Sequence, residues 1–264
     1  MSYNNFEQIE GGIKLGSNHA EWDNIFKTFV FNVTSPDGRD TFETSRELTK
    51  KIIDISSFIQ ADTVMDMGAG WGNLSMEISS FVKKVIAVEP SQENIKMARK
   101  RISDNNITNV SFLQGRFENP NCAEKVDIVL SSLTFHQVSP DNRERAVEEI
   151  RKLLRRNGIF IICDTLMFFD PEKEPEKFND VYRYILPKTM PKDIFKKNVE
   201  PYLNIDPNYI YTWKDMKRYT PKDNWFYSLR ELENIFQDKG FKIEVKEEIT
   251  PFFGIVKGRL IKEN

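Results

Sequence analysis

The sequence has few cysteines, few histidines and almost no excess of charge of either sign. Only 2 of its 264 residues are cysteine and 2 are histidine. Cys122 and Cys163 stand far apart and outside any metal-like spacing, so the sequence predicts no metal site. The formal net charge is −2 and the isoelectric point is about 5.9, so no overall basic field attracts nucleic acid.

Long apolar runs are also missing. No stretch approaches the roughly 20 apolar residues of a membrane-spanning helix. The first residues, Met1 to Glu7, lack the basic and apolar regions of a signal peptide. A chain of 264 residues suits one large α/β domain, or a domain that carries an insertion. These features predict a cytoplasmic enzyme without a membrane partner, for which nucleic acid is an unfavoured partner.

The most informative stretch is residues 64–73, which read V-M-D-M-G-A-G-W-G-N. An apolar, β-prone run from Thr63 to Met67 stops at three glycines, and a helix-period pattern follows. This order predicts a strand, a tight turn and a helix. Glycine at positions 68 and 70 permits positive φ and leaves no side chain between the backbone and a ligand. The helix N-terminus presents unpaired N–H groups to that loop.

Two acids flank this turn. Asp66 stands two residues before the first glycine, and Glu89 ends the next apolar strand, about 20 residues after the glycine loop. A carboxylate at that second place can hold both hydroxyls of a ribose. The spacing is G-x-G-x-G, with Asn73 in the last position, and differs from the G-x-G-x-x-G of dinucleotide binders. The form V-x-D-x-G-x-G-x-G, followed by an acid, resembles the first motif of the class I S-adenosylmethionine-dependent methyltransferases.

The resemblance implies an α/β fold: a Rossmann-like, seven-stranded, mostly parallel sheet with helices on both faces. It implies S-adenosyl-L-methionine as the cofactor and S-adenosyl-L-homocysteine as the product. Gly68, Ala69 and Gly70 are then expected to hold the amino-acid part of the cofactor, which Asp66 helps to orient. Glu89 is expected at the ribose, and Pro90 follows it at the same site.

The turn after the third strand is where family members commonly place an acid that hydrogen-bonds the adenine amino group. Here that turn begins Gln114-Gly115, and Arg116 takes the place of the acid. Adenine can instead be held by backbone groups and by stacking on Phe117 or Arg116. Alternatively, Glu118 supplies the acid after a shift of register.

The loop after the fourth strand carries the candidate for catalysis. In open α/β sheets, the loops beyond the strand C-termini form the ligand crevice, which places Ser131 and His136 at the reacting centre. Family members often have a histidine there beside the substrate. The ordinary pKa of histidine suits a general base near neutral pH, so His136 is the tentative catalytic residue. Alternatively, His136 only caps a turn or contacts the cofactor.

The alternation of strands and helices breaks after the fifth strand. Residues 165–227 are rich in aromatics, and prolines cut them into short helices and turns. We predict a helical and aromatic insertion that forms a substrate lid; a dimer interface and an auxiliary core are the alternatives. The methyltransferase core then comprises residues 45–164 and 228–264, preceded by an N-terminal cap segment, residues 1–44.

Taken together, these patterns predict methyl transfer to a small or medium-sized organic acceptor by in-line displacement. The N/D-P-P-Y/F clamp of amine-methylating relatives is absent, because Ser131 to Thr134 stand in its place. The alternatives are an RNA or protein methyltransferase, an NAD(P)-dependent oxidoreductase and a non-catalytic cofactor-binding module. The aromatic insertion also makes a homodimer possible.

Overall fold

A computed structural model describes residues 19–34, 40–189, 196–197, 200–203, 208–219 and 225–261. Two turn signals of the sequence, Gly11-Gly12 and the Ser-Pro-Asp-Gly stretch at residues 35–38, lie outside these ranges.

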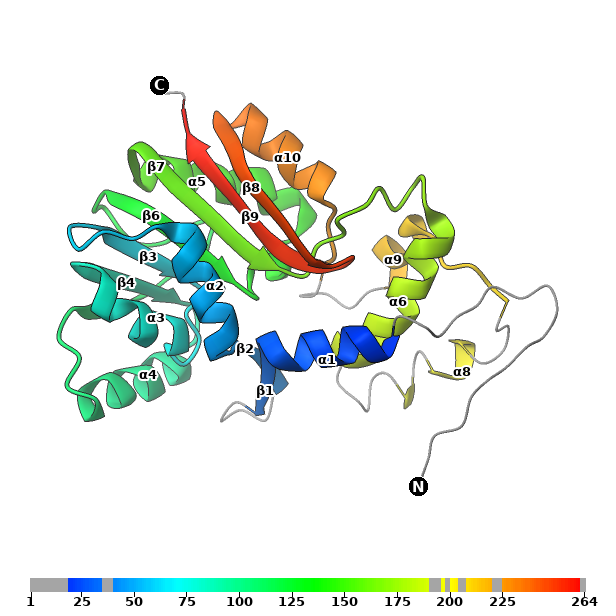
Figure 1. The fold of residues 1–264 in the computed structure, drawn as a ribbon, viewed down its shortest axis with the longest axis horizontal. Helices are drawn as coiled ribbons and strands as arrows, with labels where there is room; N and C mark the ends of the chain where they lie inside the picture. The colour runs from blue at the N-terminus through cyan, green and yellow to red at the C-terminus, as the bar shows by residue number, and fades with distance from the viewer. Residues whose placement is uncertain are drawn as a thin grey trace.

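Seven strands form one sheet with the order β5-β4-β3-β6-β7-β9-β8 (Figure 1). Strands β3 to β7 pair in parallel, and β9 runs antiparallel to both of its neighbours, β7 and β8. The predicted Rossmann-like, mostly parallel sheet is therefore confirmed. The strands are β3 (Thr63–Met67), β4 (Lys84–Glu89), β5 (Val110–Gln114), β6 (Val126–Ser132), β7 (Leu154–Asp164), β8 (Phe241–Thr250) and β9 (Phe253–Leu260).

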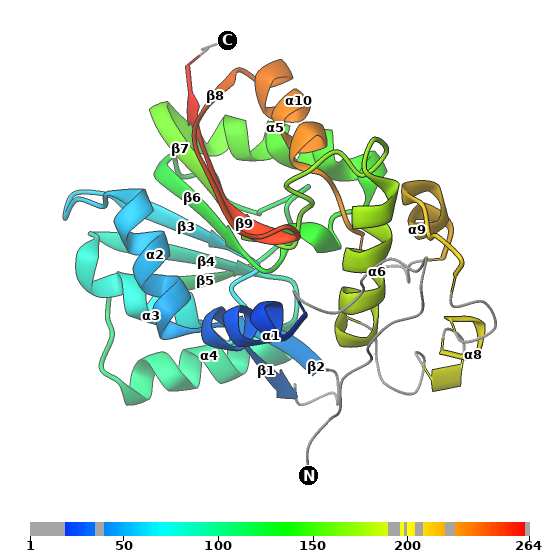
Figure 2. The same ribbon diagram turned by 45° about the vertical axis from the view of Figure 1, so that its right-hand side comes forward.

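Helices cover both faces of this sheet, because alternate strand residues point to opposite sides. Val64 belongs to the core under α2 and α3, whereas Met65, its neighbour in the chain, belongs to the core under α5 and α10. Both layers can be followed in Figures 1 and 2. The helices of the two layers are α2 (Arg46–Ser56), α3 (Asn73–Ile78), α4 (Gln92–Asp104), α5 (Arg143–Leu153) and α10 (Leu229–Asp238).

Side-chain caps begin the helices as their sequences indicate. The hydroxyls of Ser45 and Ser91 accept hydrogen bonds from the third residue of α2 and of α4. Ser228 and Glu231 form a reciprocal capping box at the start of α10. These caps fix where each helix leaves the crevice edge of the sheet.

One expected helix end is wrong. A glycine that follows a helical pattern commonly ends the helix, so the sequence predicts a helix end at Gly158, but α5 ends at Leu153 and β7 begins at Leu154. Pairing of Leu154 with Val126 already places it in the sheet. The tight turn follows inside the strand, where Asn157 adopts a φ of 58°. Gly158 is needed there because an added Cβ would lie 2.8 Å from the Arg155 carbonyl oxygen.

The N-terminal segment forms a helix and a hairpin. The helical spacing of Trp22, Ile25, Phe26 and Phe29 predicts the helix, α1 (His19–Phe29). It does not predict the antiparallel pair β1 (Val30–Thr34) and β2 (Asp40–Thr44). Helix α1 runs directly into β1, and the amide of Ser45 donates to the carbonyl of Phe29 at 3.1 Å. The hairpin is therefore held between α1 and the start of α2.

The stretch after β7 contains α6 (Pro175–Thr189), α8 (Glu200–Leu203) and α9 (Trp213–Tyr219). Its buried rings extend the core that lies under α2: the Tyr184 ring lies 5.0 Å from the Trp22 ring and 5.3 Å from the Phe252 ring. Helix α1, α6 and the β8–β9 turn thus share one aromatic cluster. Within the described residues, no helix combines the length and apolarity needed to cross a membrane.

Phe252 tests how much this aromatic cluster contributes to stability. The side chain is 1% exposed and meets rings of α1 and α6, so Phe252→Ala should cost about 3–5 kcal/mol of unfolding free energy. Urea denaturation measures the loss. Phe81→Ala is the matched control, because Phe81 is 43% exposed, and it should cost far less. Equal losses in the two variants would contradict a joint core.

Candidate cofactor and active site

The glycine loop follows β3, and its amides are hydrogen-bonded to the end of β4. Gly68, Gly70 and Gly72 have φ of 71°, 54° and 77°. The amides of Gly68 and Ala69 both donate to the carbonyl of Val88, at 2.8 and 3.0 Å. The amide of Gly70 donates to Glu89 Oε2 at 3.0 Å. These three N–H groups are therefore engaged within the protein.

Glu89 is fixed at the C-terminal end of β4. The residue is 5% exposed, and Oε1 accepts from the amide of Ser91 at 3.0 Å and from Asn94 Nδ2 at 3.1 Å. The two carboxylate oxygens together accept three hydrogen bonds, which fix the orientation of the side chain. Each carboxylate oxygen still has lone-pair capacity for a further donor. Glu89 thus lies against the glycine loop, as the sequence led us to expect for a ribose ligand, and the exposed Pro90 follows it.

Asp66 faces the interior and holds the start of α3. Its carboxylate is 2% exposed and accepts from Ser75 Oγ at 2.6 Å. Burial raises the pKa of Asp66 to about 6; the Ser75 hydrogen bond opposes that shift and the nearby charge of Glu89 adds to it. Asp66 therefore orients the loop through helix α3.

Thr134 locks the glycine loop to the loop after β6. A Cβ on Gly68 would lie 2.1 Å from Thr134 Cγ2, and Thr134 Oγ1 donates toward the carbonyls of Ser132 at 2.9 Å and Gly68 at 3.3 Å. Leu133, which is buried, adopts a φ of 57°, a conformation that costs energy for a branched side chain. The chain accepts that strain where the two loops meet.

The side chain of Ser131 was expected at the crevice, but it points into the interior of the protein. The residue is 1% exposed, and Oγ has no hydrogen-bond partner among the described residues. The next residue has the crevice-side hydroxyl instead, because successive strand residues alternate faces: Ser132 Oγ lies 2.7 Å from Thr44 Oγ1. Any ligand contact from Ser131 must therefore come from its backbone.

The adenine turn also differs from expectation. The Phe117 ring is 5% exposed and packs edge-on against Phe135 with a centroid distance of 5.4 Å, so it is not free to stack on a ligand. Arg116 is exposed and lines an open groove of about 480 Å³ together with Pro90, Glu118 and Arg145. Arg116 and Glu118 are the two side chains predicted at adenine that remain accessible.

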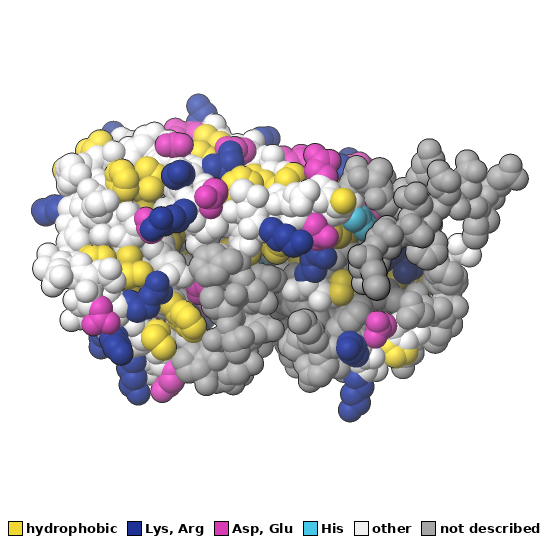
Figure 3. All heavy atoms as spheres, turned by 60° about the horizontal axis from the view of Figure 1, so that its bottom comes forward, with side chains coloured by type: hydrophobic (Ala, Val, Ile, Leu, Met, Phe, Trp, Pro, Cys, Tyr) yellow, Lys and Arg dark blue, Asp and Glu magenta, His cyan; other side chains and the backbone are white. Residues whose placement is uncertain are grey.

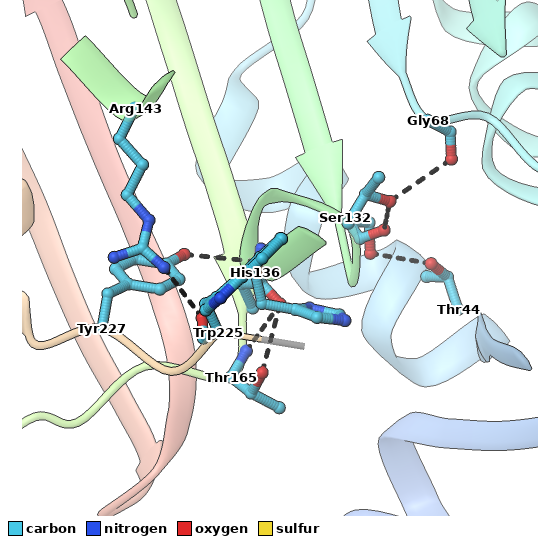
Figure 4. Close-up of polar contacts among 10 residues, drawn as sticks. Thr44, Gly68, Ser132, His136, Arg143, Thr165, Trp225 and Tyr227 are labelled. Carbon is cyan, nitrogen blue, oxygen red and sulfur yellow. Dashed lines mark hydrogen bonds and ion pairs between the residues drawn. The ribbon is translucent and has the colours of Figure 1, made fainter. Parts of the chain in front are cut away.

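His136 is held by a buried acid that the sequence analysis missed. Asp164 ends β7 and is fully buried; its two oxygens lie 2.7 Å from the amide and 2.7 Å from Nδ1 of His136. Asp164 also accepts from the Thr165 amide at 2.7 Å and from the Tyr227 hydroxyl at 3.2 Å (Figure 4). An acid directly after a buried strand, the same signal that marked Glu89, was present at Asp164.

This pairing defines the chemistry of the imidazole. With Asp164 as the acceptor of a hydrogen bond from Nδ1–H, the lone pair stands on Nε2 and the plane of the ring is fixed. A carboxylate in this position stabilises the imidazolium that forms when Nε2 takes a proton, as in hydrolase triads. The arrangement therefore suits a general base.

A buried arginine anchors the segment beside His136. Arg143 is 4% exposed; its Nη2 donates to the carbonyl of Trp225 at 2.9 Å and its guanidinium carbon lies 4.7 Å from the centre of the Tyr227 ring. The amide of Trp225 donates in turn to the carbonyl of His136 at 3.0 Å. Residues 225–227 thus reach the crevice from the end of the predicted insertion (Figure 4).

The end of β2 contributes a second unexpected acid. Glu43 is 8% exposed and accepts from Asn73 Nδ2 at 2.6 Å. Burial raises the pKa of Glu43 to about 7; the Asn73 hydrogen bond opposes the shift, and the charges of Asp66 and Glu89 add to it. Carboxylates from β2, β3 and β4 therefore converge on the glycine loop.

The electrostatics of this crevice decide which ligands it fits. Glu43, Asp66 and Glu89 surround the loop, and Arg101 is the cation that acts on Glu43. A dinucleotide brings a pyrophosphate that needs free loop amides and no facing acids. S-adenosylmethionine brings an ammonium, a sulfonium and ribose hydroxyls, which carboxylates attract. The residues present fit S-adenosylmethionine.

Comparison with known proteins agrees with this fit. Residues 64–158 match a family described as a methyltransferase domain. An uncharacterized methyltransferase of Oceanobacillus iheyensis is 26% identical over 138 residues, which are 51% of this chain and 61% of that protein. Residues 64–158 are therefore similar to a methyltransferase domain, which agrees with the Rossmann-like sheet described above.

Solved structures share the methyltransferase fold at low identity. The YcgJ protein from Bacillus subtilis has a TM-score of 0.57 and 16% identity, covering 83% of this chain and all of that chain. A Burkholderia thailandensis 1,6-didemethyltoxoflavin-N1-methyltransferase, solved with its substrate and S-adenosylhomocysteine, has a TM-score of 0.53 and 13% identity, covering 82% and 78%. The aligned part of the chain spans about three fifths of the Oceanobacillus relative.

The matched region, residues 64–158, includes only part of the crevice. The glycine loop, Glu89 and His136 lie inside residues 64–158. Glu43 and Asp164 lie outside them, on segments that only the fold brings to the crevice. Within the described residues, no group of three or more His, Cys, Asp or Glu side chains is arranged to hold a metal ion.

The contact between Gly68 and Thr134 can be tested by adding one methyl group. Gly68→Ala and Gly72→Ala both place alanine at positive φ, but only the first drives Cβ into Thr134; at Gly72 the nearest atom is Phe112 Cζ at 3.2 Å. Gly68→Ala should therefore destabilise the protein more, by about 1–3 kcal/mol beyond its control. Urea unfolding of both variants measures the difference, and equal stabilities would disprove the locked contact.

Proposed function

We propose that this methyltransferase moves a methyl group from S-adenosylmethionine to a small or medium-sized organic acceptor. The observation that carries the proposal is the buried Asp164 that holds His136, two residues after Thr134, whose hydroxyl donates to the glycine loop. When bound, S-adenosylmethionine supplies an activated methyl group. The protein then has to hold the acceptor in line, exclude water and remove a proton where the acceptor has one.

The cofactor would be held mainly by groups that are already fixed. Glu89 would accept hydrogen bonds from the ribose hydroxyls, and the backbone of Gly68 to Gly70 would flank the amino-acid part. Asp66 would act through Ser75 by keeping helix α3 and the loop in place. Arg116 or Glu118 would lie at the adenine edge.

His136 would serve as the general base for an acceptor with an O–H or N–H group. When the acceptor loses its proton on methylation, Nε2 of His136 would take up that proton. The imidazolium is stabilised by the Asp164 carboxylate on Nδ1, so the charge created on the ring is matched across a 2.7 Å contact. Tyr227 and Thr165 keep that carboxylate in position.

The size of the acceptor is inferred from charge and from one fold relative. On the face shown in Figure 3, Lys and Arg side chains are scattered among acidic ones and form no single basic patch. Nucleic acid binding depends on such a patch. The Burkholderia thailandensis protein of similar fold is a 1,6-didemethyltoxoflavin-N1-methyltransferase and was solved with 1,6-didemethyltoxoflavin bound. A small organic acceptor in the cytoplasm is therefore the proposal, and a protein or RNA acceptor is the alternative.

Calorimetric titration with S-adenosylhomocysteine, with NAD in a parallel cell, tests the cofactor assignment. One-to-one binding of S-adenosylhomocysteine without heat from NAD is the expected result, and an acceptor screen would follow. Binding of NAD alone would overturn the proposed function.

Glu89 should contribute to that affinity. Glu89→Ala removes the proposed ribose acceptor and should weaken S-adenosylhomocysteine binding by about 1.5–3 kcal/mol, the range for a charged hydrogen bond. Glu93→Ala, on the exposed side of α4, is the charge-matched control and should bind normally. An unchanged affinity in Glu89→Ala would remove this residue from the site.

The His136–Asp164 pair should affect turnover and spare cofactor binding. His136→Ala and Asp164→Asn should each lower kcat by at least about 100-fold with a suitable acceptor, because the base is lost or its tautomer is wrong. The control is His19→Ala, which changes the second histidine of the chain; this residue lies on α1, and the variant should keep normal turnover. Loss of cofactor affinity in His136→Ala would instead make this histidine a cofactor contact.

A further inference from the structure

The last two residues of β2 span the crevice above the glycine loop. Thr44 reaches the β6 side, where its hydroxyl lies 2.7 Å from Ser132 Oγ (Figure 4). Glu43 reaches the α3 side, where Oε2 accepts from Asn73 Nδ2 at 2.6 Å. The end of the β1–β2 hairpin is therefore tied to both sides of the cofactor crevice.

The second oxygen of Glu43 points at the glycine loop. A Cβ on Gly70 would lie 2.9 Å from Glu43 Oε1, so a larger residue at position 70 would displace the carboxylate. Gly70 is the same residue whose amide donates to Glu89 at 3.0 Å. Glu43 and Glu89 thus face one glycine from opposite segments of the chain.

Glu43 is buried, and none of the described cations is paired with it. Its hydrogen-bond donor, Asn73, is neutral, and the charged groups that act on it are Asp66 from β3, Glu89 from β4 and Arg101 from α4. Among the described residues, no Lys, Arg or His side chain forms an ion pair with Glu43. A buried carboxylate is unfavourable unless it is paired, and the raised pKa of about 7 reflects that cost. A cationic ligand bound next to Glu43 would offset this cost of burying the charge.

We propose that Glu43 binds the positively charged part of the cofactor and that the end of the β1–β2 hairpin covers the cofactor site. The proposal rests on the proposed function and adds a residue outside the matched family region, residues 64–158. Two groups of the cofactor carry positive charge, the α-ammonium and the sulfonium. S-adenosylhomocysteine keeps the first and lacks the second, so the two ligands together identify the partner.

A purely structural role for Glu43 makes a different prediction. If Glu43 only accepts the hydrogen bond from Asn73 and so fixes the start of α3, glutamine would serve equally well. Its amide oxygen can accept the same bond without the negative charge. The substitution Glu43→Gln therefore removes charge while it preserves shape, and it separates the two roles.

The experiment is calorimetric titration of the full chain and of Glu43→Gln with S-adenosylmethionine and S-adenosylhomocysteine at pH 8. If Glu43 binds the ammonium, both affinities should fall about tenfold or more; if it binds the sulfonium, only that for S-adenosylmethionine should fall. Unchanged affinity for both ligands overturns the proposal. Failure of the unaltered chain to bind either ligand overturns the proposed function instead.

Two further measurements keep the test independent of folding and of general charge effects. Glu47→Gln, on the exposed start of α2, is the control for loss of one charge and should bind both ligands normally. The affinity of the unaltered chain for the affected ligand should fall as the pH is lowered through about 7, where Glu43 takes up a proton. Glu43→Gln should lose most of that pH dependence; retention of the full dependence would also contradict the proposal.

Unliganded Glu43→Gln also reports on the buried charge directly. Because the folded-state pKa is raised, the protonated acid is favoured on folding, so the native state loses stability as pH rises from about 4.5 to 7. Glutamine has no such loss, and Glu43→Gln should therefore melt at a higher temperature than the unaltered chain at pH 8 and at nearly the same temperature at pH 4.5. A lower melting temperature at pH 8 would mean that the charge is already compensated, which contradicts the proposal.

Discussion

The close approach of Gly68 to Thr134 is the constraint on which the crevice depends. Strands β3 and β6 are neighbours in a parallel sheet, so the loops at their C-terminal ends must share one small space. A glycine on one loop and a threonine on the other fill that space, and the threonine hydroxyl bonds to both strands. The cofactor loop and the loop that carries His136 consequently keep one relative position.

Buried acids at strand ends organise the rest of the site. Glu89 at the end of β4 gathers donors from the glycine loop and from α4, and Asp164 at the end of β7 gathers donors from three separate segments. In each case the carboxylate replaces solvent as the acceptor for groups that would otherwise lose their hydrogen bonds on burial. The same carboxylates therefore stabilise the loops and lie where a ligand would bind.

Local signals in the sequence account for much of this architecture. The glycine loop, the serine caps and the alternating strands depend on neighbours within a few residues, and they were predictable for that reason. Glu43 and Asp164 become partners of Asn73 and His136 only through tertiary pairing, which one sequence does not reveal. The choice between Ser131 and Ser132 depends on the register of β6, because a shift of one residue exchanges the two faces of a strand. The hydroxyl of Ser132 is the one that contacts Thr44.

Phe117 and Gly158 illustrate two further limits of local reasoning. An aromatic residue in a loop is equally suited to a ligand or to the core, and packing against Phe135 decided for the core. A glycine after a helical pattern is a common helix end, but the pairing of Leu154 with Val126 ended α5 earlier. In both cases a contact distant in sequence outweighed a plausible local rule.

The continuity of α1 with β1 links two parts of the molecule that the sequence separates widely. Helix α1 packs in the aromatic cluster with α6, and its last residue, Phe29, is followed at once by the first residue of β1. The hairpin that carries Glu43 therefore takes its position in part from the segment after β7. A change in the packing of that segment against α1 would therefore also move the hairpin, and with it the position of Glu43 against the glycine loop.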